Sequence, residues 1–163
     1  MHYLKKSGFV IAVVLIAACS KKEVVVTPPP PPAPVYKPVP LIAVESATPL
    51  RKQSQSKQIG ANISFSNISP ATYQYILFKT TAYDKNGKVV PPRKSRDSSA
   101  YLRVAGPIKP GQLSASNAWQ NTWNSKNVHC LAVDKVEIIF SDGSIEVAEG
   151  ETLIDKKHLR CIN

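Results

Sequence analysis

The sequence predicts an all-β domain of about seven short strands in two packed sheets, preceded by a signal peptide and a proline-rich linker. Three observations carry this prediction. Apolar and polar residues alternate with a period of two over residues 61–67, and β-branched and aromatic residues fill residues 72–83. Turn signals separate the apolar runs at short intervals, and no helical pattern exceeds two turns except for a short candidate over 151–158.

Residues 1–18 are typical of an export signal. Lys5 and Lys6 precede an apolar run that extends from Phe9 to Ala18. This run is about half of the roughly 20 residues that a membrane-spanning helix needs. A cleaved signal is therefore favoured over the alternative, a permanent transmembrane anchor.

The end of this signal is more specific. Ile16-Ala17-Ala18-Cys19 resembles the lipobox of bacterial lipoproteins, in which the signal is cut before a cysteine that then carries acyl chains. The resemblance implies lipid attachment at Cys19; the alternative is an ordinary signal peptide that ends in a cysteine. Ser20 follows, instead of the aspartate that holds members of this class in the inner membrane, so the resemblance implies the cell outer membrane, with the domain facing the periplasm.

Residues 19–40 form a proline-rich linker. The chain has 14 prolines, and those at 28–32, 34, 38 and 40 fall within this segment. Proline lacks an N–H and fixes φ, so such a run forms neither helix nor sheet and extends as polyproline II. At about 3.1 Å per residue, residues 28–40 would span roughly 40 Å and hold a domain away from the lipid. A ligand for SH3-type grooves is the alternative.

Residues 41–163 form the predicted folded domain. The run over 72–83 places Ile76, Phe78, Thr80 and Ala82 on one face and Tyr73, Tyr75, Leu77 and Tyr83 on the other. Asp84-Lys85-Asn86-Gly87 predicts a turn, 106–111 a loop and Asp142-Gly143 a hairpin. Further strands are expected at 88–90, 100–105, 112–118, 128–140 and 145–147. Short strands at this spacing favour an immunoglobulin-like sandwich.

Three motifs and a pair of tryptophans add a family resemblance. The order of "YILFKTTAYDKNGKVV", "GPIKPG", two tryptophans and "VDKVEIIFSDGS" is similar to an uncharacterised immunoglobulin-like domain of bacterial surface and exported proteins. The similarity covers about residues 58–148. It implies the fold and an exported setting, and it brings no catalytic residues. The segment from Ala148 onward, with Cys161, is not expected from that pattern.

Two cysteines remain after Cys19. An exported protein meets an oxidising compartment, so Cys130 and Cys161 predict a disulfide. The alternative is a zinc site that adds His129 and His158. Adjacent residues of a strand point to opposite faces, which makes it difficult for His129 and Cys130 to share one ion.

Positive charge is the surface feature that points to a class of ligand. The formal net charge is +10, and the basic residues fall into three groups. The group proposed as an anion or partner site consists of Lys85, Lys88, Arg93, Lys94 and Arg96; the other groups are Arg51, Lys52 and Lys57, and Lys156, Lys157 and Arg160. Such groups attract acidic glycans, acidic proteins or anionic lipid headgroups. Nucleic acid fits the charge but not the compartment, and a solvated basic surface is the alternative.

Trp119 and Trp123 are expected to pack under the 106–111 loop, with an exposed platform for a partner or glycan as the alternative.

The sequence contains few signs of catalysis: no G-x-S-x-G, H-E-x-x-H or P-loop motif occurs, and the carboxylates of the C-terminal part are scattered. We therefore expect a non-catalytic, lipid-anchored binding or scaffolding protein of the bacterial envelope, without a cofactor or metal. One alternative is an accessory lipoprotein that docks on a secretion or envelope-assembly machine. The least favoured is a small metal-binding protein or hydrolase.

Overall fold

The domain is an all-β sandwich. The computed structural model describes residues 37–51, 58–93, 95–155 and Cys161. The predicted signal, the lipid site at Cys19 and the linker up to residue 36 lie outside these residues. The described residues form the strands β1 (Ile42–Arg51), β2 (Ile59–Asn67), β3 (Tyr73–Tyr83), β4 (Val89–Val90), β5 (Ser99–Ile108), β6 (Leu113–Trp123), β7 (Cys130–Phe140), β8 (Ile145–Ala148) and β9 (Leu153–Asp155), with one 3-10 turn, η1 (Gly150–Thr152).

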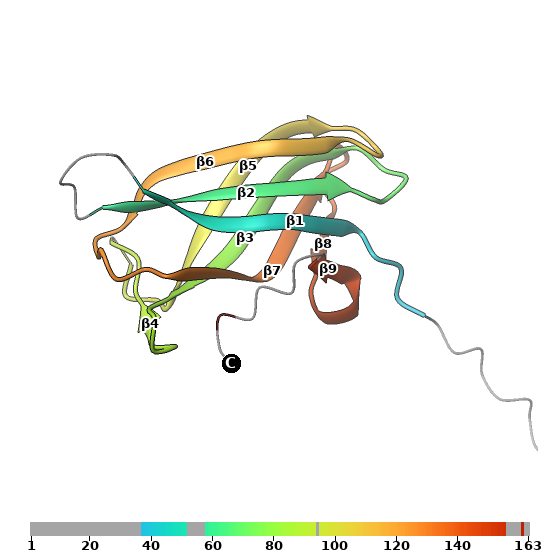
Figure 1. The fold of residues 1–163 in the computed structure, drawn as a ribbon. Coiled ribbons are helices and arrows are strands. Elements are labelled where there is room, and N and C mark those ends of the chain that lie inside the picture. The colour runs from blue at the N-terminus through green and yellow to red at the C-terminus, as the bar shows by residue number, and fades with distance from the viewer. Residues whose placement is uncertain (1–36, 52–57, 94, 156–160, 162–163) are drawn as a thin grey trace, which may run out of the picture. The chain divides into compact units, whose positions relative to one another are not determined.

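Two sheets face each other (Figure 1). One has the order β6-β2-β1-β9, and the other has β3 at its centre, between β7 and β8 on one side and β5 and β4 on the other. All pairs are antiparallel except β1 with β9, which is parallel. In the described part of the chain no helix is long and apolar enough to cross a membrane.

The core lies between the sheets because each strand turns alternate side chains inward. Phe65 of β2 and Phe78 of β3 meet with ring centroids 5.1 Å apart. The prediction for Ile76, Phe78, Thr80 and Ala82 is confirmed, since all four are buried. The other fully buried large side chains are Trp123, Tyr73, Ile42, Ile63, Leu131, Ile138, Val44, Val128 and Val136.

Tyr73 does not lie on the outer face with Tyr75, as the alternation predicts. The register of β3 shifts between these two residues, and the irregularity turns Tyr73 inward. Its ring meets the ring of Phe140 edge-on at 5.6 Å. Its hydroxyl donates a hydrogen bond of 2.5 Å to the carbonyl of Leu41, which ties β3 to the segment that leads into β1.

Several boundaries differ from the sequence prediction. The strand expected at 100–105 continues to Ile108, so half of the predicted 106–111 loop belongs to β5. The short helix expected over 151–158 is instead η1 followed by β9, and residues 156–160 lie outside the description. β1 was not predicted at all: its alternation is interrupted by an irregularity between Val44 and Ser46, and it contains Pro49.

Cys130 and Cys161 form the predicted disulfide, with their Cα atoms 5.5 Å apart. The bond joins the first residue of β7 to the C-terminal segment that follows β9. Because both sulfurs are in this bond, neither is available as the thiolate that the zinc alternative required. His158 of that alternative lies outside the described residues.

The disulfide predicts a large loss of stability when both cysteines are replaced. The cross-link spans 31 residues, and its removal restores loop-closure entropy to the unfolded chain worth about 3–4 kcal/mol. Cys130→Ser combined with Cys161→Ser should lower the unfolding free energy by that amount in urea titrations. Reductant should destabilise the wild type similarly and leave the double variant unchanged. An unchanged urea midpoint in the double variant would contradict the structural role of the bond.

Tyr73 predicts a specific response to alkaline pH. Burial raises the pKa of its phenol above 10.0, so the folded state holds this proton more tightly than the unfolded state. The resulting stability is complete below pH 10 and is lost as the pH rises through the folded pKa. Tyr73→Phe should cost about 1 kcal/mol at neutral pH and flatten the alkaline loss. Thermal unfolding from pH 8 to 12 measures both effects, with Tyr75→Phe on the outer face as the matched control; an equally steep loss in Tyr73→Phe would refute the assignment.

Candidate functional site: the basic loop end

One end of the sandwich gathers loops that are far apart in the sequence. The turn between β3 and β4, the loop between β4 and β5, the loop between β6 and β7 and the end of β1 meet there, opposite the end at which the chain enters β1 (Figure 1). We call this region the loop end. Its described basic residues are Arg51, Lys85, Lys88, Arg93, Arg96 and Lys126.

The first of three adjoining pockets contains Arg51. It has a volume of about 340 Å³ and is also lined by Lys85, Lys126 and His129. The Arg51 guanidinium donates hydrogen bonds to the carbonyl of Val128 at 2.7 Å and to the carbonyl of Lys126 at 3.4 Å. A guanidinium has five N–H donors, so these two bonds fix its position and leave donors for a ligand.

The carboxylate of this pocket accepts hydrogen bonds from the turn to which it belongs. The Asp84 carboxylate accepts hydrogen bonds from the backbone N–H groups of Lys88 at 2.9 Å and Asn86 at 2.8 Å. These bonds hold the pKa of Asp84 below its ordinary value, so it remains an anion at neutral pH. Gly87 completes the turn at φ +76°, a conformation that glycine adopts without steric cost. The turn thereby presents Lys85 and Lys88 at the surface.

Two further pockets continue from the first. The second, of about 420 Å³, shares Asp84 and Asn127 with the first and adds Lys88 and Arg93. The third, of about 330 Å³, shares Pro92 and Arg93 with the second. The pockets are therefore neighbours around the loop end and share parts of their walls.

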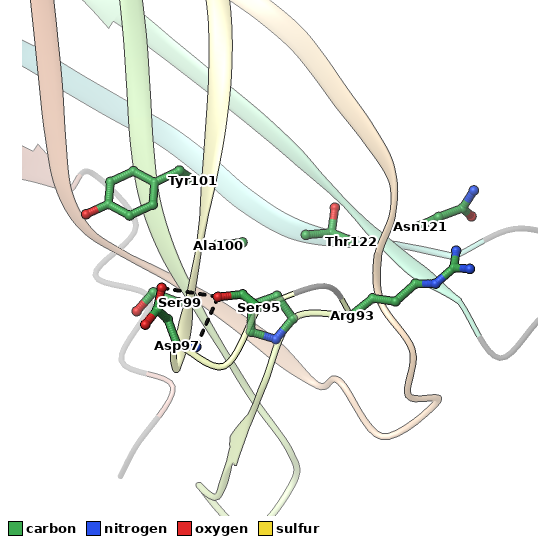
Figure 2. Close-up of a pocket in the computed structure, with 9 residues that line it drawn as sticks. Arg93, Ser95, Asp97, Ser99, Ala100, Tyr101, Asn121 and Thr122 are labelled. Carbon is green, nitrogen blue, oxygen red and sulfur yellow. Dashed lines mark hydrogen bonds between the residues drawn. The ribbon is translucent and has the colours of Figure 1, made fainter.

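The third pocket lies between the edges of the two sheets, where β5 and β6 separate (Figure 2). The backbone N–H of Arg93 donates to the carbonyl of Thr122 at 2.8 Å and attaches the β4–β5 loop to β6. Asn121 lines this pocket at φ +59°, the left-handed region, which few residues other than glycine adopt within a strand. Ser95 and Asp97 bond to each other on the loop, while the Tyr101 ring lies on the far side of β5 from Arg93.

The structure rearranges the predicted basic groups. Lys85 lies with Arg51, which the sequence placed in another group, whereas Lys88 and Arg93 share the second pocket. Arg96 is exposed on the loop outside these three pockets, and Lys94 lies outside the described residues. Sequence reasoning missed Lys126 and did not assign His129 to an anion site. Proximity in the sequence could not reveal them, because the sheets bring these loops together.

The two tryptophans do not pack under the 106–111 loop. Trp123 is fully buried in the core, and Trp119 is half-buried farther along β6. The Trp119 ring lies 6.4 Å from that of Phe78, and its indole N–H donates to the carbonyl of Arg103 on β5 at 3.1 Å. Trp119 thus bridges the two sheets along the seam that opens into the third pocket.

None of the described loop-end cations forms a direct salt bridge with a described carboxylate, although the Asp84 carboxylate interacts electrostatically with Lys85 and Lys88. Among the residues that the structure describes, the ion pair is Lys135 with Glu137 on the outer face, at 2.8 Å. Within the same residues no three His, Cys, Asp or Glu side chains are grouped to hold a metal ion.

Comparisons with protein-family models, with curated proteins and with solved structures find no match to this chain.

The Asp84 turn predicts an acid-sensitive loop end. The pKa of Asp84 is lower in the folded state than in the unfolded state. The stability that its carboxylate contributes is therefore present above pH 3.8 and is lost as the pH falls through the pKa of the folded state. Asp84→Ala should lower the hydrogen-exchange protection of the Asn86 and Lys88 amides several-fold at neutral pH. Asp142→Ala, which removes a similar cap on Ser144, is the control and should leave both amides unchanged. Unchanged protection in Asp84→Ala would show that the turn does not need the carboxylate.

Proposed function

We propose that this chain is a lipoprotein of the bacterial outer membrane that presents a non-catalytic binding domain to the periplasm. In this proposal Cys19 carries the lipid and the proline-rich linker holds the domain away from the membrane. The lipobox-like signal supports the export step. The Cys130–Cys161 disulfide supports it independently, because such bonds persist in oxidising compartments.

The proposal includes an immunoglobulin-like fold. In the seven-strand form of such domains the first, second, fourth and fifth strands form one sheet and the third, sixth and seventh form the other, whereas forms with added strands place these beside the third. Here β1, β2 and β6 share a sheet, and β3, β7 and β8 share the facing one. This order supports the assignment if β4 and β5 are taken together as the strand region beside β3.

The loop end is the proposed binding surface. The observation that carries this conclusion is the convergence of five cations, Arg51, Lys85, Lys88, Arg93 and Lys126, on adjoining pockets whose described carboxylates are Asp84 and Asp97. Cations that converge in this way focus positive potential and attract an acidic partner.

The position of the loop end favours a partner other than the anchoring membrane. The linker joins the domain at the start of β1, and Arg51 ends that ten-residue strand. At about 3.3 Å per residue the strand separates the two ends by roughly 33 Å. The cations therefore lie at the end remote from the linker, where another envelope component would meet them.

Site-specific crosslinking in the native envelope tests the binding function. A photo-reactive residue at Asn86 should form an adduct that disappears in Lys85→Gln/Lys126→Gln, because the partner is held by charge. The same residue at Gln112, on an exposed loop at the other end, should form none and serves as the control. The mass of the N-terminal peptide from the same cells should show an acylated Cys19.

Either of two results would overturn this proposal. Adducts that are absent at Asn86, or that persist when both lysines are neutralised, would remove the loop end as a charged binding surface. An unmodified Cys19 in an uncleaved chain would remove the anchor and the envelope location.

A further inference from the structure

We propose that the three pockets of the loop end together bind one acidic polysaccharide whose sugars carry carboxylates, with one carboxylate seated at Arg51. This inference rests on the proposed binding function of the loop end and narrows its partner to a charged glycan. It is carried by the fixed guanidinium, the continuity of the pockets, their polar side chains and the backbone of Asn121.

The Arg51 pocket is organised before any ligand arrives. Two carbonyl groups of the β6–β7 loop hold the guanidinium, so binding an anion there costs little side-chain entropy. Lys85 and Lys126 line the same pocket from two different loops. A carboxylate that enters meets these three cations and one anion, Asp84, which is hydrogen-bonded within its turn and whose charge is partly offset by Lys85 and Lys88, so the cations of the pocket exceed its acid.

The continuity of the pockets favours an extended ligand. Each volume lies near the lower end of the range for small-molecule sites, about 300–1,000 Å³. The second pocket adds Lys88 and Arg93 beside Asp84, and the third continues from Arg93 to Asp97 and the polar side chains of Asn121 and Thr122. A polymer with regularly placed anions can engage the cations of successive pockets at once, and the linked contacts reinforce one another.

The polar side chains favour a glycan over an acidic protein. Amides and hydroxyls that can bond to sugar hydroxyls line the pockets, namely those of Asn86, Asn121, Thr122, Asn124, Ser125 and Asn127. A protein interface is centred instead on apolar and aromatic anchors. Of the exposed large apolar side chains, Val89 and Tyr101 line these pockets, and the Tyr101 ring lies on the far side of β5 from Arg93 (Figure 2), whereas Leu113, Ile145 and Val147 lie on other strands.

Asn121 gives the third pocket a specific polar group. Its φ of +59° is a backbone conformation that asparagine tolerates better than most residues, and such conformations concentrate at ligand sites. Figure 2 shows its amide on the same side of the pocket as the Arg93 guanidinium. An amide beside a guanidinium can bond a sugar hydroxyl while the cation holds the adjacent carboxylate.

The test measures binding of the full chain, purified in a non-ionic detergent, to a fluorescently labelled alginate octasaccharide. Poly-L-glutamate with the same number of carboxylates is the acidic-peptide probe, and neutral dextran is the uncharged one. We expect alginate to bind at least about tenfold more tightly than poly-L-glutamate, which corresponds to about 1.4 kcal/mol. Dextran should not bind, and added salt should weaken the binding of alginate.

Three variants locate the site. Lys85→Gln/Lys126→Gln should weaken alginate binding roughly tenfold or more. Lys37→Gln/Lys109→Gln makes the same change in charge outside the loop end and should leave it unchanged. Asn121→Gly preserves the left-handed backbone and removes the amide, so it should weaken the binding of alginate but not of poly-L-glutamate.

The outcomes separate this inference from the function on which it rests. Equal binding of alginate and poly-L-glutamate, or no effect of Asn121→Gly on alginate, would overturn the glycan assignment. Failure of alginate to bind would overturn it as well. In each case charge-dependent crosslinks at Asn86 would still support the loop end as a binding surface for a different acidic partner.

Discussion

The burial of two sheet faces against each other is the constraint on which the rest of the molecule depends. Side chains alternate along each strand, so packing Phe65 against Phe78 determines which residues of β2 and β3 face inward. The same requirement sets the register between neighbouring strands and hence the end at which each loop emerges. The loop end is a consequence of this packing, because Arg51 at the end of β1, Lys85 in the β3–β4 turn and Lys126 in the β6–β7 loop are far apart in the sequence and line one pocket.

The stability of the fold and the charge of its loop end are coupled through a few contacts. Cations held close together repel one another, and this repulsion opposes folding in their neighbourhood. Arg51 offsets part of it by bonding to two carbonyls of the β6–β7 loop, and Asp84 offsets part of it inside its turn. The Cys130–Cys161 disulfide joins the C-terminal segment to β7 one residue beyond His129. The elements that hold the domain together thus also hold the proposed site in shape.

The fold separates the point at which the chain enters the domain from the cations of the loop end. Leu41 is held by the Tyr73 hydroxyl and by a backbone bond to Thr152, so the chain is secured where it enters the domain. The cations lie at the other end of β1 and leave the attachment undisturbed. Under the proposed function, this arrangement would place a rigid strand between the tether and the binding end.

Local chemistry in the sequence was sufficient for the all-β class, most central strands, the Asp84 turn and the disulfide, because alternation, turn residues and an isolated cysteine pair are short-range signals. It was not sufficient for β1 and β9, since a strand with interrupted alternation and a strand of three residues acquire their structure from pairing, β1 with β2 and β9 with β1. The sequence also did not predict that Tyr73 lies in the core. The irregularity that turns its side chain inward arises from the pairing of β3 with its two neighbouring strands. The grouping of Arg51 with Lys85 and Lys126 was likewise invisible in the sequence, because distances between loops depend on how two sheets stack and not on separation along the chain.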